Sequence, residues 1–126
     1  MSARMLHTCI RVGNLDKSVE FYKSLGFYES RRKEHYDNGF ALVFMKLEES
    51  SHEIELTYNV GTESYEIGNG FSHVAIEVEN LEDEQERCKS LGYEVTDLKG
   101  LPGSMPSYFF VTDPDGYKVE VIRKKV

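Results

Sequence analysis

Two histidines open the two copies of an internal repeat. Residues 7–27 (HTCIRVGNLDKSVEFYKSLGF) return 66 positions later as residues 73–93 (HVAIEVENLEDEQERCKSLGY). Each copy begins with a histidine, His7 or His73, on a segment with the alternating pattern of a β-strand. Each copy ends on Lys-Ser-Leu-Gly followed by an aromatic residue. A repeat of this length predicts two similar folding modules, each contributing one imidazole at the same place.

Each half also ends on a strand-like segment that carries a glutamate between aliphatic residues. Two carboxylates that approach each other repel unless a proton or a cation lies between them. A divalent metal removes that repulsion and also uses imidazole nitrogens as ligands. A set of two His and two Glu without thiolate suits Ni²⁺, Co²⁺, Fe²⁺, Mn²⁺ or Zn²⁺. The repeat therefore predicts a metal site with four ligands, namely His7, Glu55, His73 and Glu120.

The elements that must position these side chains follow the order β-α-β-β-β in each half. In a strand, alternate residues share a face, so His7, Cys9 and Arg11 are expected on one side of the first strand. The first module spans 1–62, and the second spans 70–126. We expect an α+β fold in which the two modules form an eight-stranded, half-open barrel with outer helices. The expected helices are 17–25 and 83–91, and the expected strands are 5–12, 27–32, 40–46, 53–58, 73–78, 93–98, 107–111 and 117–122.

Composition excludes several classes of protein. The chain of 126 residues has 40% hydrophobic residues and a formal net charge of −7, which argues against a nucleic-acid or anionic-membrane partner. Two cysteines are too few for a disulfide framework. The N-terminal residues MSARMLHT contain no apolar signal segment, and no apolar run is long enough to cross a bilayer. We therefore expect a cytoplasmic protein with a small-molecule substrate.

Three segments, LHTCIRVGNLDKSVEFY, IELTYNVG and DPDGYKVEVI, resemble glyoxalase I, the lactoylglutathione lyase family of the vicinal-oxygen-chelate superfamily. The resemblance covers nearly the whole chain. It implies a homodimer with shared active sites, in which His7 and Glu55 come from one subunit and His73 and Glu120 from the other. It favours Ni²⁺ or Co²⁺, with Zn²⁺ as the alternative, because the chain lacks the extra segments of the zinc-preferring members.

The resemblance also implies a reaction, in which the hemithioacetal of methylglyoxal and glutathione becomes S-lactoylglutathione. Glu120 is the implied proton-transferring base, and Glu55 is the other carboxylate ligand or a second proton carrier. Arg11 matches a position that pairs with a glutathione carboxylate, and Asn59 one that hydrogen-bonds the tripeptide. Met105 matches a loop methionine near the apolar part of the substrate.

Two departures leave the thiol open. Some family members have an arginine four residues before the second histidine, where this chain has Asn69, and Lys99 is the only basic residue that the closing loop offers. Another low-molecular-weight thiol is therefore an alternative to glutathione. Other metal enzymes of the scaffold (epimerase, thiol transferase or dioxygenase) and a non-catalytic binding module remain competing interpretations. A dioxygenase needs only two His and one carboxylate, so Glu55 argues against it.

Overall fold

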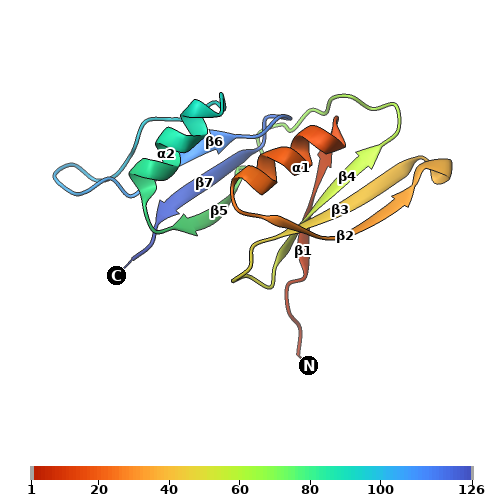
Figure 1. Ribbon diagram of the computed structural model, residues 1–126, viewed down its shortest axis with the longest axis horizontal. Helices are drawn as coiled ribbons and strands as arrows, with labels where there is room; N and C mark the ends of the chain where they lie inside the picture. The colour runs from red at the N-terminus through yellow and green to blue at the C-terminus, as the bar shows by residue number, and fades with distance from the viewer. Residues whose placement is uncertain (1, 126) are drawn as a thin grey trace. The chain divides into compact units, whose positions relative to one another are not determined.

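The computed structural model describes residues 2–125 and divides into two compact units, Met1–Glu66 and Ile67–Val126 (Figure 1). Each unit contains a mixed β-sheet and one long helix, which confirms the α+β class and the two-module organisation. The units are described separately below. No helix within residues 2–125 combines the length and the hydropathy that a membrane span requires.

The first unit contains a four-stranded sheet. Its strands are β1 (His7–Val12), β2 (Tyr28–His35), β3 (Phe40–Lys46) and β4 (Glu53–Asn59), and a short 3-10 helix, η1 (Tyr36–Asn38), joins β2 to β3. The strand order is β1-β4-β3-β2, with β1 parallel to β4 and the other neighbours antiparallel. The first and last strands of the module therefore lie side by side, and this places two distant segments of sequence next to each other.

Helix α1 (Leu15–Ser24) packs against β2, β3 and β4 and covers one face of this sheet (Figure 1). It begins two residues earlier than the sequence pattern predicts, because Asn14 is the N-cap and its side-chain oxygen accepts the Lys17 amide. Gly26 ends the turn with φ of +102°, a conformation that suits a residue without a Cβ. Phe21 and Tyr22 are almost completely buried, so the core lies between helix and sheet.

The second unit repeats this plan with a smaller sheet. It contains β5 (His73–Val78), α2 (Leu81–Ser90), β6 (Tyr108–Thr112) and β7 (Lys118–Arg123). The strand order is β5-β7-β6, with β5 parallel to β7 and β6 antiparallel to it, and α2 packs against β6 and β7. As in the first unit, the first and last strands of the module are direct neighbours.

The strand predicted at 93–98 is absent, so the described residues form seven strands instead of eight. Isolated bridges join Val95 to Val111 and Lys99 to Tyr108, at the place where a fourth strand would lie. Backbone hydrogen bonds still link this segment to β6, since the Thr96 amide donates to the Phe110 carbonyl and the Thr112 amide to the Glu94 carbonyl. The Gln85 amide donates to the carbonyl of Thr96, and the Thr96 hydroxyl accepts the Phe110 amide. Side-chain hydrogen bonds of this kind compete with a regular ladder.

Helix α2 also departs from the predicted pattern. It begins at Leu81, because the Asn80 side chain caps the Asp83 amide. Leu81, Gln85 and Cys88 form its buried stripe, whereas Leu91, the C-cap residue, is 50% exposed.

Candidate metal centre

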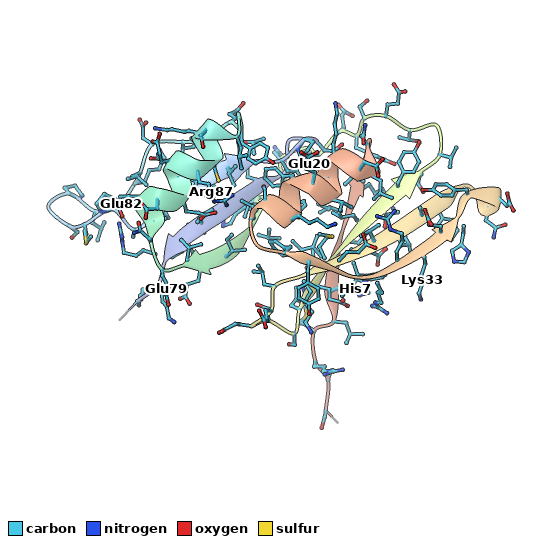
Figure 2. All side chains as sticks on the ribbon, viewed as in Figure 1. His7, Glu20, Lys33, Glu79, Glu82 and Arg87 are labelled. Carbon is cyan, nitrogen blue, oxygen red and sulfur yellow. The ribbon has the colours of Figure 1, made fainter. Side chains whose placement is uncertain are left out.

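His7 and Glu55 meet on the sheet face opposite α1. His7 is the first residue of β1 (Figure 2), and Glu55 lies on the adjacent strand β4. Ile54 and Leu56 point into the core, so the alternation of the strand turns Glu55 to the other face. His7 Nε2 lies 3.0 Å from Glu55 Oε1, and the two side chains are 35% and 14% exposed.

His73 and Glu120 make the equivalent pair in the second unit. Glu120 on β7 pairs in register with Ala75 on β5, just as Glu55 pairs with Cys9 two residues beyond the histidine. His73 Nε2 lies 3.1 Å from Glu120 Oε1, with exposures of 33% and 19%. The structure therefore brings the four predicted ligands together as two pairs with the same local geometry.

An aromatic ring supports each imidazole. Phe44 meets His7 edge to face, with ring centroids 5.5 Å apart and planes at 78°. Phe110 meets His73 in the same way, at 5.2 Å and 80°. Sequence reasoning missed both rings, although they are 66 residues apart and obey the same repeat as the histidines. Such edge-to-face contacts restrict the rotation of the imidazole ring.

Hydroxyl groups contact one residue of each pair, Glu55 in the first unit and His73 in the second. The Thr57 hydroxyl donates to Glu55 Oε2 at 2.8 Å, and Cys9 Sγ lies 3.3 Å from the Thr57 oxygen. The Ser72 hydroxyl lies 2.6 Å from His73 Nδ1. The sequence analysis did not single out these residues, because hydroxyls on strands are too common to carry a signal by themselves.

In the first unit, the charged side chain of Arg31 packs over the ring of Phe44. The guanidinium of Arg31 lies 3.9 Å from the centroid of the Phe44 ring and forms an ion pair with Glu53 at 3.1 Å. A hydrogen bond from Ser30, and secondarily the charge of Arg31, lower the pKa of Glu53. Glu53 therefore stays ionised and holds Arg31 over the ring.

The predicted substrate-binding residues lie outside the two His–Glu pairs. Arg11 is exposed on β1 and pairs in register with Thr57. Asn59 ends β4, where its amide nitrogen donates to the Tyr65 hydroxyl at 3.1 Å. Met105 is 69% exposed in the loop before β6, and Lys99 and Asn69 are also exposed. Arg11 and Asn59 thus share the first unit with His7 and Glu55, whereas Met105 belongs to the second.

The donor set of each pair fits a divalent metal. Imidazole nitrogen and carboxylate oxygen are ligands of Ni²⁺, Co²⁺ and Zn²⁺, and in each pair one of each faces the other across about 3 Å. Within residues 2–125, no group of three or more His, Cys, Asp or Glu side chains gathers into a metal-holding cluster. Each unit therefore presents one imidazole and one carboxylate as a pair.

Comparison with known proteins shows the family of the chain. The model of the Glyoxalase/Bleomycin resistance protein/Dioxygenase superfamily matches residues 4–121. The lactoylglutathione lyase of Neisseria meningitidis is 43% identical over 126 residues, covering 97% of this chain and 91% of its own. The chain belongs to the glyoxalase I family.

Solved structures of glyoxalase I agree with this assignment. The trypanothione-dependent glyoxalase I of Leishmania major is 34% identical, with a TM-score of 0.84 over 97% of this chain and 87% of its own. Glyoxalase I from Zea mays is also 34% identical, with a TM-score of 0.87 over 98% of this chain and 45% of the maize chain. The resemblance that the three sequence segments indicate is thus confirmed.

Proposed function

We propose that this glyoxalase I family member is a lactoylglutathione lyase, which converts the hemithioacetal of methylglyoxal and glutathione into S-lactoylglutathione. One observation carries the proposal. A chain 43% identical to a lactoylglutathione lyase over nearly its whole length presents two equivalent His–Glu pairs on exposed sheet faces. The reaction removes methylglyoxal, a reactive 2-oxoaldehyde.

The proposed centre uses both pairs. His7 and Glu55 from one subunit and His73 and Glu120 from the other would hold one divalent metal in a homodimer whose modules close into a half-open barrel. The similar geometry of the two pairs supports a centre that uses both, because modules related by a pseudo-twofold axis bring equivalent side chains towards that axis. We favour Ni²⁺ or Co²⁺, with Zn²⁺ as the alternative.

The mechanism follows from the positions of the carboxylates. A divalent cation bound by these residues would supply positive charge that stabilises the oxygens of the substrate as negative charge develops on them. Glu120 takes the proton from C1 of the hemithioacetal and returns a proton to C2, which leaves the thioester at C1. Glu55 remains a carboxylate ligand. The rings of Phe44 and Phe110 hold the imidazoles in place throughout.

Residues beside the pairs bind the rest of the substrate. Arg11 shares a strand face with His7, so its guanidinium suits a glutathione carboxylate in two hydrogen bonds. Asn59 hydrogen-bonds the tripeptide backbone, and Met105 contacts the apolar part of the substrate. The Leishmania relative depends on trypanothione, so the thiol differs within the family.

A matrix of metals and thiols tests the proposal. Metal-free protein is loaded with Ni²⁺, Co²⁺ or Zn²⁺ and assayed with methylglyoxal plus glutathione or another low-molecular-weight thiol, following thioester absorbance. We expect turnover with glutathione and the highest rate with Ni²⁺ or Co²⁺. Metal binding without turnover for any thiol would contradict the lyase assignment and favour the binding-module interpretation.

A further inference from the structure

The two His–Glu pairs are supported at different atoms. Thr57 follows Glu55 by two residues on β4, and the matching position on β7, two residues after Glu120, is Ile122. Ser72 precedes His73, and the matching position before His7 is Leu6. A hydroxyl therefore supports the carboxylate in the first unit and the imidazole in the second.

Thr57 and His7 together contact both oxygens of Glu55. Its hydroxyl donates to Oε2 at 2.8 Å, while Oε1 faces His7 Nε2 at 3.0 Å. Since the Thr57 proton is directed to Glu55, the thiol of Cys9 donates to the Thr57 oxygen across 3.3 Å. A carboxylate bound at both oxygens has one preferred orientation of its plane.

Ser72 fixes the ring of His73. Its hydroxyl lies 2.6 Å from Nδ1, while Nε2 faces Glu120 at 3.1 Å. A hydroxyl both donates and accepts, so Ser72 supports the ring when Nδ1 is bare and when it carries a proton. Groups of this kind orient a metal-binding imidazole through its second nitrogen.

The second carboxylate, Glu120, faces His73 Nε2 at 3.1 Å, and the aliphatic Ile122 stands where Thr57 stands in the first unit. We propose that Thr57 and Ser72 are positioning residues, which hold the Glu55 carboxylate and the His73 imidazole in the orientations in which they would bind the metal. This inference rests on the proposed function, because it concerns the same four residues.

Metal affinity tests the positioning role in the absence of substrate. Co²⁺ binding to metal-free protein is measured by chelator competition and by its visible absorption, for Thr57→Val and Ser72→Ala. We expect about 10- to 100-fold weaker binding in each variant, with recovery in Thr57→Ser and Ser72→Thr. Wild-type affinity in Thr57→Val or in Ser72→Ala would overturn the role of that residue.

Two control variants remove a hydroxyl group that does not contact either His–Glu pair. Thr8→Val deletes a hydroxyl that lies 2.9 Å from His52, and Ser90→Ala deletes one that donates to the Arg87 carbonyl. Both controls should bind Co²⁺ as the wild type does. An equal loss of affinity in the controls would overturn the inference, since it would show a general effect of lost hydroxyls.

The measurements distinguish failure of the lyase assignment from failure of the positioning role. If wild-type protein lacks turnover but binds Co²⁺ in a manner that depends on Thr57 and Ser72, the lyase assignment fails and the positioning role stands. If wild-type protein is active and both variants bind Co²⁺ normally, the positioning role fails and the lyase assignment stands.

Discussion

At the scale of single residues, the proposed base is Glu120. Glu120→Gln keeps the size of the side chain and removes the proposed base, so we expect kcat to fall about 100- to 10,000-fold at saturating metal. The measurement is steady-state turnover of the hemithioacetal, with bound metal quantified in the same sample. A metal-loaded variant with nearly normal kcat would remove Glu120 as the base.

The two cysteines should differ in reactivity. Cys88 is fully buried in α2, and burial raises the pKa of its thiol to about 11, with a smaller contribution from the charge of Glu84. Because the thiolate is the reactive form, iodoacetamide at pH 8 should leave Cys88 unmodified in native protein and label it in urea. The Cys9→Ser variant makes Cys88 the sole thiol for mass spectrometry. Equal labelling rates with and without urea would contradict the packing of α2.

The two His–Glu contacts could be predicted from sequence because the repeat marks all four residues independently of any structure, and their role as metal ligands stays a prediction. Their supporting residues could not. The contacts of Thr57 and Ser72 depend on side-chain rotamers, and the repeat does not preserve either residue in the other half. The two phenylalanines are repeated, but phenylalanines within strands usually belong to a core, so the pattern did not distinguish them.

At the scale of elements, Arg123 joins three parts of the second unit. From β7 its Nε donates to the Pro106 carbonyl at 3.0 Å, and its terminal nitrogens bind the carboxylate of Glu82, which lies in the first turn of α2 (Figure 2). Pro106 closes the loop that carries Met105. This arginine therefore fixes one end of the loop that we propose to contact substrate.

Replacing Arg123 should loosen that loop. In Arg123→Gln we expect faster deuterium exchange at the amides of Lys99 and Ser107, whose hydrogen bonds lie at the base of the loop. Lys124→Gln, which affects a 3.8 Å contact to the exposed Glu79, is the matched control. Unchanged exchange in Arg123→Gln would show that the backbone alone fixes the loop.

The same ion pair should respond to acid. The hydrogen bond from Arg123 lowers the pKa of Glu82 below its ordinary value of 4.5. Its stabilisation is therefore present at neutral pH and is lost as pH falls through the lowered pKa. After correction for the intrinsic pH dependence of exchange, we expect the loop amides to open more often in wild type and in Lys124→Gln as pH falls through this range. Arg123→Gln, which lacks the ion pair, should show no such change.

Most elements could be predicted from periodicity and capping residues. The exception, 93–98, has a strand-like sequence, but the Gln85 side chain donates to the Thr96 carbonyl and the Thr96 hydroxyl accepts the Phe110 amide of β6, and only isolated bridges form. A competition of this kind depends on a side chain from α2, eleven residues away from Thr96, and no local pattern contains it.

At the scale of the whole molecule, each chain presents one His–Glu pair in each of its two units. The sequence repeat predicts what each unit contributes, but it does not specify which unit meets which. That choice depends on surfaces built from many side chains. A centre formed within one chain and a centre shared by two subunits use the same residues, and they differ in one testable respect.

The most direct test combines two inactive variants in one dimer. Glu55→Gln and Glu120→Gln are co-expressed with different affinity tags, and the mixed dimer is purified through both tags. If sites are shared, one site of the mixed dimer contains both substitutions and the other contains neither, so roughly half of the wild-type activity should return. A mixed dimer as inactive as its two parents would contradict a centre built from one pair of each subunit.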